Sequence, residues 1–184
     1  MRRSIALLVL LASCTGGTPS VSPTGPGGST PLAACRADGL ISIGEKLPDC
    51  SFRSFDGSVL KLTSLNGKPA VLNFWASWCT FCIKEMPDFQ AVSSELEDQI
   101  TIVGFDLLGV EGETEVSARS FSKSRGVTYP LAFDDKGLLY AHFSVRPTLP
   151  TTIFVRANGT VAFRKFGPMD RTDLRDAIRD HLKV

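Results

Sequence analysis

The chain has 184 residues, of which 43% are hydrophobic and 21% are charged, and its formal net charge is +1. This length suits one domain with an appendage, and the apolar residues are numerous enough for a sizeable core. Because the charge is nearly balanced and no basic stripe occurs, a nucleic acid is excluded as the expected partner.

The first residues have the pattern of a secretory signal. Two arginines follow Met1, an apolar stretch covers residues 5–11, and small residues precede Cys14. A positive start, a short apolar region and small residues at a cleavage point define such signals. The stretch is too short to span a bilayer. We therefore expect residues 1–13 to be a signal peptide, and its removal would leave a net charge near −1 because two arginines are lost.

The end of this signal resembles the bacterial lipobox. In Leu11-Ala12-Ser13-Cys14 the cysteine would be diacylated and become the first residue of the mature protein. An ordinary secretory signal that contains a cysteine is the alternative. Lipidation is favoured because residues 15–31 contain only Gly, Ser, Thr, Pro and one Val, a composition typical of a flexible spacer. We expect 14–36 to be a lipidated tether that anchors the chain to a membrane.

A folded domain is predicted for residues 37–184, beginning with a β-hairpin. Residues 49–55 alternate like a strand, Asp56-Gly57 is a turn signal, and residues 59–62 resume on the other side. The apolar run 70–74 then predicts a central buried strand.

Helices and strands alternate after this run. The pattern predicts a helix over residues 79–97, in which Pro87 should cause a kink, then a buried strand over 100–105 and a helix over 113–124. The C-terminal part predicts a turn at 134–137, a short helix over 138–143 and a strand over 151–155. A tight hairpin turn at 158–159, a second strand over 160–166 and a final helix over 170–182 follow. The order β-α-β-α-β-β-α predicts an α/β fold with a mixed sheet.

Directly after the central strand lies a Cys-x-x-Cys motif. Cys79 closes the strand region and Cys82 lies one turn into the next helix. A helix N-terminus stabilises the thiolate of the first cysteine, and the second can resolve a mixed disulfide. A structural disulfide is an alternative, although two cysteines so close together on a helix have poor geometry for a stabilising cross-link. The motif therefore predicts thiol–disulfide chemistry without a cofactor.

A zinc knuckle is a further alternative, because it uses the same cysteine spacing. It would need a second pair of ligands, and His142 and His181 stand apart without ligand spacing. We therefore expect no metal.

The remaining cysteines can be assigned by elimination. Export would place the chain in an oxidising compartment, where cysteines pair. With Cys14 lipidated and the motif cysteines active, Cys35 and Cys50 are left. We expect them to form a structural disulfide, whose loop closure would contribute roughly 3 kcal/mol on a chain-entropy estimate. Two free thiols are the alternative.

Residues 41–182 resemble the thioredoxin fold and are most similar to the exported TlpA/ResA/DsbE-like group, the membrane-attached thioredoxins of cytochrome c maturation. The resemblance is carried by the hairpin, by the motif with its preceding strand, by Glu85 and by Leu149-Pro150-Thr151-Thr152. It implies a central mixed sheet flanked by helices, with an N-terminal hairpin. It also implies that Pro150 is a cis-proline facing the cysteine pair.

A cis turn at Pro150 would expose the backbone of Leu149 to the extended chain of a client. An ordinary loop proline is the alternative, and Pro147 competes for the same role. Trp75 and Trp78 are expected to pack around the pair, with Trp78 contributing to the client-binding surface.

Glu85 is a candidate proton acceptor. Cytosolic thioredoxins carry a buried aspartate in the strand before the motif, and Asn73 stands there in this chain. In the resembling group a glutamate at the Glu85 position lies near the cysteines. A buried carboxyl there would have a raised pKa and could take the proton from Cys82 during resolution. A solvated helix residue beside Lys84 is the alternative.

The sequence therefore predicts an exported, extracytoplasmic and lipid-anchored thiol–disulfide oxidoreductase that acts as a monomer. It would pass electrons from a membrane donor, such as a DsbD/CcdA-like protein, to protein clients with thiols or disulfides, for which apocytochrome c is one candidate. The alternative is an oxidase that forms disulfides in secreted proteins.

Two further function classes are less favoured by the residues. A thiol peroxidase shares the hairpin and core, but its Pro-x-x-x-Thr-x-x-Cys pattern is absent because Leu72 and Ala76 occupy those positions before Cys79. A non-catalytic binding module would usually have lost a cysteine, and both are present.

Overall fold

The computed structural model describes residues 35, 39–146 and 148–184. The predicted signal peptide, Cys14 and the tether apart from Cys35 lie outside these residues, and so does Pro147. In the described part of the chain, no helix is both long and apolar enough to cross a membrane.

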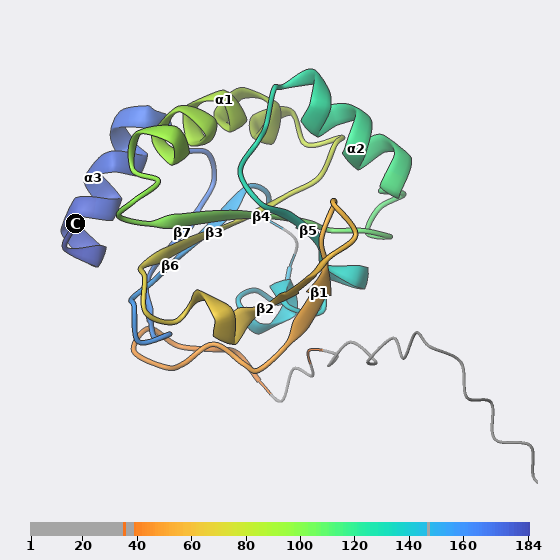
Figure 1. Cartoon of the computed structure of the whole chain (residues 1–184). Helices are drawn as coiled ribbons and strands as arrows, with labels where there is room; N and C mark the ends of the chain where they lie inside the picture. Colours follow the sequence, from red (N-terminus) through yellow and green to blue (C-terminus); the bar gives the residue numbers. More distant parts are fainter. Residues whose placement is uncertain (1–34, 36–38, 147) are drawn as a thin grey trace, which may run out of the picture. The chain divides into compact units, whose positions relative to one another are not determined.

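A mixed sheet forms the centre of the folded unit (Figure 1). In the described residues its strand order is β5-β4-β3-β6-β7, with β3, β4 and β5 parallel and β6 and β7 antiparallel to their neighbours. Every residue of β3 is buried, as expected for an apolar run between two neighbouring strands. The strands are Ala70–Trp75 (β3), Thr101–Asp106 (β4), Leu131–Phe133 (β5), Thr151–Val155 (β6) and Val161–Phe166 (β7).

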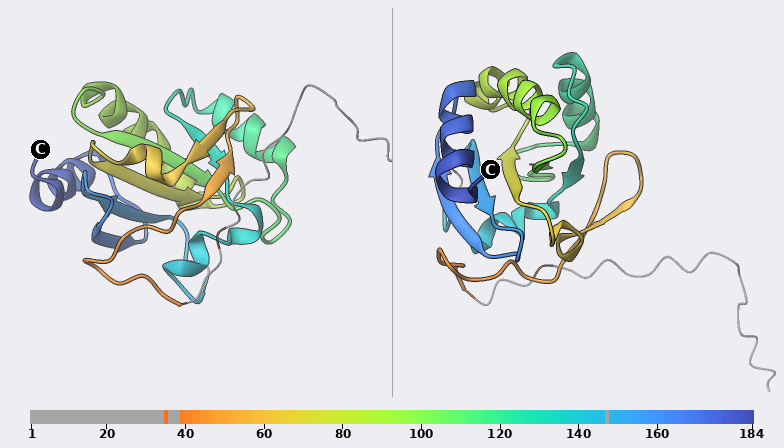
Figure 2. Two further views of the ribbon diagram at one scale, coloured as in Figure 1. Left: turned by 60° about the horizontal axis from the view of Figure 1, so that its bottom comes forward. Right: turned by 60° about the vertical axis from the view of Figure 1, so that its left-hand side comes forward.

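Three α-helices pack on one face of this sheet. They are Thr80–Glu95 (α1), Glu115–Ser124 (α2) and Arg171–Leu182 (α3). Figure 2 shows α3 beside β6 and β7, with α1 and α2 completing the same layer. Each helix begins at a residue whose side chain accepts a backbone N–H of the first turn, and these caps are Cys79, Thr114 and Asp170.

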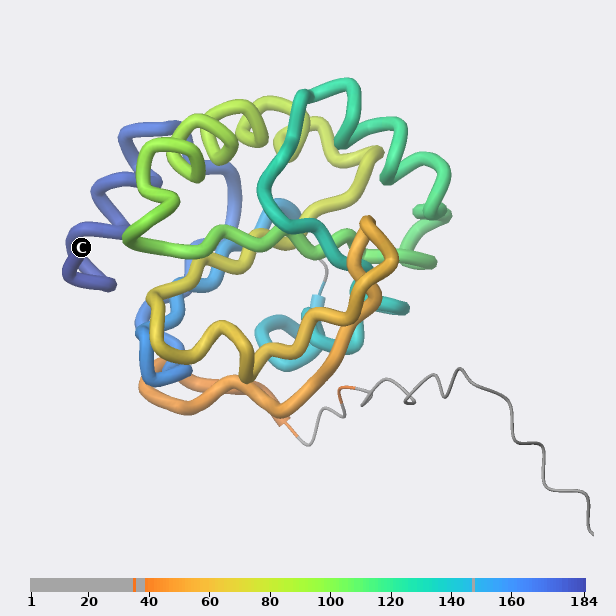
Figure 3. Tube along the Cα trace, in the orientation of Figure 1, coloured from red at the N-terminus to blue at the C-terminus, as the bar shows by residue number. Residues whose placement is uncertain are grey.

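The opposite face is covered by the N-terminal hairpin and by short 3-10 helices. The hairpin pairs Ser51–Arg53 (β1) with Val59–Lys61 (β2), and the 3-10 helices are Leu62–Leu65, Asp135–Gly137 and Tyr140–His142. The tube trace shows the hairpin running beside the segment of β5 (Figure 3). There the N–H of Phe55 donates to the carbonyl of Leu131 at 2.8 Å. The hairpin therefore protects the edge of the sheet that β5 would otherwise expose.

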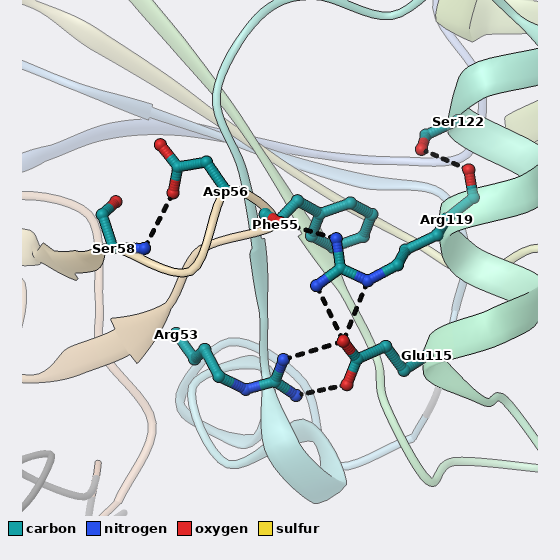
Figure 4. A network of polar contacts seen from close by, with 7 residues as sticks. All are labelled: Arg53, Phe55, Asp56, Ser58, Glu115, Arg119 and Ser122. Atoms are coloured by element: carbon teal, nitrogen blue, oxygen red, sulfur yellow. Dashed lines mark hydrogen bonds and ion pairs between the residues drawn. The ribbon is translucent and has the colours of Figure 1, made fainter.

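An ion-pair network joins this hairpin to α2 (Figure 4). Glu115 accepts two hydrogen bonds from Arg53, at 2.7 and 3.0 Å, and two from Arg119, at 2.7 and 2.8 Å. Hydrogen bonding to Arg53, and then to Arg119, lowers the pKa of Glu115 to about 2. Arg119 also donates to the carbonyl of Phe55, whose ring stacks on Phe133 at 4.2 Å. Because these charged groups are more than one third exposed, packing of the rings is the more dependable contribution to stability.

The architecture is the expected thioredoxin fold with a mixed sheet and an N-terminal hairpin, and two local differences have physical reasons. The strand β5 was not predicted, because three residues are too few to show an alternation. The predicted helix over 138–143 is a 3-10 turn at Tyr140–His142, because the N–H groups of His142 and Phe143 donate to carbonyls only three residues earlier. Pro87 lies inside α1, and the kink expected there stays a prediction.

Candidate active site

The two motif cysteines lie where β3 leads into α1. After Trp75 the chain makes a tight turn, in which the N–H of Cys79 donates to the carbonyl of Ala76 at 3.1 Å. Cys79 then caps α1 and is joined to Cys82 by a disulfide, with a Cα–Cα distance of 5.3 Å. The N–H of Cys82 donates to the Cys79 sulfur at 3.1 Å. The first cysteine therefore sits at the positive end of the helix, where a thiolate is stabilised.

The two sulfur-bearing residues differ in access to solvent. Cys79 keeps 6% of its surface exposed, and Cys82 keeps none. The aromatic residues around them differ more strongly. Trp75 is fully buried, whereas Trp78 and Phe81 are 41% and 53% exposed. The partly exposed Cys79 is thus flanked in sequence by two exposed aromatic side chains, Trp78 and Phe81.

Glu85 lies on the buried side of α1, one turn beyond Cys82. Its side chain is only 2% exposed. One carboxylate oxygen accepts from the Asn73 side-chain amide at 2.8 Å, and the other accepts from the N–H of Met169 at 3.0 Å. The alternative of a solvated helix residue is therefore wrong.

Burial raises the pKa of Glu85 to about 7, and the hydrogen bonds from Asn73 and Met169 oppose this rise while the charge of Asp88 adds to it. A carboxyl group with such a pKa can gain or lose a proton near neutral pH. This is the behaviour that a group exchanging protons with a thiol requires.

The peptide bond between Leu149 and Pro150 is cis. Thr151, the first residue of β6, pairs with Phe74 in β3, and the two strands are antiparallel. The segment before β6 therefore lies at the same end of the strands as the turn that carries the cysteines. Leu149 is half-buried and packs against both hydrophobic cores, whereas Pro150 is buried.

A second group of buried acids, which was not predicted from the sequence, lies around the end of β4. Asp106 pairs in register with Trp75, is fully buried, and has no hydrogen-bond partner among the described residues. Burial, and then the charges of Glu113 and Asp134, raise its pKa to about 8. The available signal was an aspartate ending a buried strand beside the strand of the motif.

Glu113 connects this acid group to the cysteine turn. Its carboxylate accepts the N–H of Ser77 at 2.6 Å and the hydroxyl of the same residue at 2.8 Å. The hydroxyl of Ser117, in the first turn of α2, donates to it at 2.6 Å. The turn before Cys79 is therefore fixed to the start of α2.

The other two described cysteines form a bond of their own. Cys35 and Cys50 are joined by a disulfide with a Cα–Cα distance of 5.1 Å, and both are buried. Among the described residues, no group of three or more His, Cys, Asp or Glu side chains is placed to hold a metal ion.

Comparisons with known proteins find relatives of this chain. A profile described as the AhpC/TSA family matches residues 43–164. The chain is similar to the thiol-disulfide oxidoreductase ResA of Geobacillus thermodenitrificans, with 30% identity over 139 residues that cover 75% of this chain and 77% of ResA.

Two solved structures are also similar. One is a secreted Mycobacterium tuberculosis disulfide oxidoreductase homologous to Escherichia coli DsbE, with a TM-score of 0.62 and 27% identity over 71% of this chain and 94% of that chain. The other is the exposed lipoprotein thioredoxin of Streptococcus pneumoniae, with a TM-score of 0.64 and 27% identity over 72% of this chain and 99% of that chain.

The buried acid Asp106 gives a prediction about stability and pH. Because its pKa is raised in the folded state, the fold binds a proton that the unfolded chain releases, and stability falls as pH rises from about 4 towards 8. We expect Asp106→Asn to remove this share of the loss. The free energy of unfolding, measured with urea at pH 6 and pH 9, should fall less in the variant than in the wild type. The difference should be at most about 1.4 kcal/mol for each pH unit between pH 6 and the raised pKa of Asp106. Equal pH dependence of the two proteins would contradict the prediction.

Proposed function

The chain belongs to the AhpC/TSA family and is a thiol–disulfide oxidoreductase, and from that premise we propose that it reduces disulfide bonds of protein clients. The observation that carries the proposal is the Cys79–Cys82 disulfide at the N-terminus of α1, with a buried carboxyl group one turn away. In the proposed reaction the thiolate of Cys79 attacks one sulfur of a client disulfide, which breaks the client S–S bond, releases the other client sulfur as a thiolate that takes up a proton, and forms a mixed disulfide. The thiolate of Cys82 then attacks Cys79, which releases the client as a thiol and leaves the pair oxidised.

The reducing direction is supported by what stabilises the Cys79 sulfur. A strongly oxidising pair needs a reduced form that is unusually stable. Here the sulfur accepts its hydrogen bond from the main chain of Cys82 rather than from a cationic side chain. Ionisation of the buried Glu85 would add negative charge nearby and disfavour a thiolate. Both points favour a reductant, with an oxidase as the alternative function.

Clients and donor follow from the family resemblance and from the site. Leu149 and Pro150, together with the exposed Trp78, form the proposed client-binding surface. An extended client segment would pair with the main chain at Leu149. An apocytochrome c is the proposed client, and a membrane protein of the DsbD/CcdA type is the proposed electron donor.

The proposal predicts distinct roles for the two cysteines. We expect the reduced protein to cleave the disulfides of insulin, Cys79→Ser to abolish this activity, and Cys82→Ser to accumulate a mixed disulfide with the client. The reduction potential of the pair should lie nearer the value of thioredoxin, about −270 mV, than that of DsbA, about −120 mV. Insulin turbidity, mass spectrometry and equilibration with a dithiol buffer measure these outcomes.

Other outcomes would favour the other functions. A potential near that of DsbA would establish the oxidase alternative. Consumption of peroxide at rates above those for insulin would indicate a thiol peroxidase. Trapping of the client by Cys79→Ser instead of Cys82→Ser would reverse the assignment of the attacking residue.

Glu85 is proposed to accept the proton of Cys82 while the mixed disulfide is resolved. A base acts in its ionised form, so exchange should accelerate as pH rises through about 7, the pKa of this group. We expect Glu85→Gln to slow resolution by on the order of 10²–10⁴-fold above that pH and to remove the inflection. Stopped-flow kinetics from pH 5 to 8 can measure this.

Asp88→Asn is the matched control for Glu85→Gln, since it also removes one carboxylate from α1 but leaves the Asn73 and Met169 hydrogen bonds in place. It should retain the inflection, moved to a lower pH because the charge of Asp88 no longer raises the pKa of Glu85. An unchanged rate and pH profile in Glu85→Gln would refute the proposed role.

We also propose that the protein is exported and anchored to the membrane through a lipid on Cys14. The sequence around Cys14 supports this, and so does the similarity to an exposed lipoprotein thioredoxin. The buried Cys35–Cys50 bond is typical of proteins in oxidising compartments. Residues 14–36 would then serve as the lipidated tether.

This proposal predicts where the protein fractionates in a bacterial host. Wild-type protein should be labelled by a fatty acid analogue and recovered with membranes, and Cys14→Ser should lose both properties. Cys82→Ser, another cysteine-to-serine change, should keep them. An unlabelled, freely secreted wild-type protein would indicate an ordinary secretory signal.

A further inference from the structure

The hydroxyl of Tyr140 lies at the centre of a hydrogen-bonded group beneath the segment Thr148–Thr151. It accepts the N–H of Thr148 at 2.8 Å and lies 3.1 Å from the carbonyl oxygen of the same residue. It also lies 3.4 Å from the hydroxyl of Thr151. The side chain of Tyr140 is 4% exposed. Its contact with Thr151 is buried, and its contacts with the exposed residue Thr148 are partly buried.

Two of the residues that the Tyr140 hydroxyl contacts, Thr148 and Thr151, enclose Leu149 and Pro150. The third is Arg146, whose carbonyl oxygen lies 3.3 Å from the hydroxyl. Thr151 closes the segment by donating its hydroxyl to the carbonyl of Thr148 at 2.5 Å. Tyr140 therefore touches both ends of this short segment. A phenol can donate and accept at once, which explains why one side chain serves both ends.

Tyr140 is itself held firmly from two sides. The carboxylate of Asp134 accepts the backbone N–H groups of Leu139 and Tyr140, at 2.9 and 2.8 Å, and Asp134 is fully buried. The ring packs edge-on against Phe74 of β3, with centroids 5.4 Å apart. The hydroxyl is thus positioned by the central strand and by the end of β5.

We propose that Tyr140 is a positioning residue for client recognition, because it holds Thr148–Thr151 in the arrangement that presents the main chain of Leu149 to an extended peptide. The inference rests on the proposed function of reducing protein disulfides. Main-chain pairing with a peptide needs donors and acceptors in a fixed order, and a segment ordered in advance loses less entropy on binding. The ligand class is a polypeptide segment around an accessible disulfide.

The role separates two kinds of substrate. A protein client must dock on the main chain beside the cysteines, whereas a small dithiol needs only access to a sulfur atom. Loss of the Tyr140 hydroxyl should therefore affect the first reaction and spare the second. If Tyr140 merely stabilised the fold, loss of its hydroxyl would change the reactions with the protein client and with the small dithiol to the same extent.

The test uses Tyr140→Phe, which keeps the ring against Phe74 and removes only the hydroxyl. For insulin as the protein disulfide, we expect KM to rise about fivefold with kcat little changed, the loss typical of one hydrogen bond. The rate of reduction of the oxidised pair by dithiothreitol, and its reduction potential, should equal those of the wild type.

Tyr129→Phe is the matched control. Tyr129 is also buried, but it belongs to the core on the opposite face of the sheet, and its hydroxyl has no hydrogen-bond partner in the described part of the chain. The control should leave KM for insulin unchanged. Thr151→Val removes the other hydroxyl of the group, and it should raise KM less in the Tyr140→Phe background than alone, since the two residues act on one segment.

Three outcomes would overturn the inference. They are an unchanged KM in Tyr140→Phe, equal losses with insulin and dithiothreitol, and the same rise of KM in Tyr129→Phe. If the wild type reacted with dithiothreitol but reduced no protein disulfide, the proposed function itself would fail, and the inference with it. A lower melting temperature with unchanged KM would assign Tyr140 a purely structural role.

Discussion

The carboxylate of Glu85, one helical turn beyond Cys82, joins three parts of the fold. It extends from α1, accepts a hydrogen bond from Asn73 in β3, and accepts another from the N–H of Met169 just before α3. Burying a carboxylate without such donors would cost several kcal/mol. The position of α1, and with it the geometry of the cysteine pair, therefore depends on donors that come from a central strand and from the C-terminal region. A substitution of Glu85 or Asn73 would disturb both packing and proton balance, whereas the donor at Met169 is a main-chain N–H that a change of side chain leaves in place.

The other side of the cysteine turn is fixed by the start of α2. Glu113 binds Ser77 of the turn, and Glu115, two residues later, binds Arg53 of the hairpin. One helix end thus couples the hairpin to the residues that precede Cys79. Glu113 is buried, whereas the Arg53–Glu115 pair is partly exposed. The hydrogen bonds between Glu113 and Ser77 are therefore expected to be stronger than the Arg53–Glu115 ion pair.

The fold and the cysteine pair could be predicted from local patterns, whereas much of the surrounding site could not. A helix that starts after a buried strand needs no long-range information, so α1 followed from the sequence. The burial of Glu85 is consistent with its place between Cys82 and Phe89 on the apolar side of α1. The contacts of Tyr140 with Thr148 depend instead on how an irregular segment returns to the sheet, and no periodicity encodes that return.

The disulfide between Cys35 and Cys50 links two points of the chain that are 15 residues apart in sequence. It connects Cys35 directly to the residue before β1. Mechanical load applied to the chain ahead of Cys35 would pass through the sulfur atoms into the hairpin, and the intervening residues 36–49 would carry little of it. For the same reason, a protease that cut once among those residues would leave both pieces attached. A force applied to the chain N-terminal to Cys35 would thus act on a strand that Arg53 joins to α2.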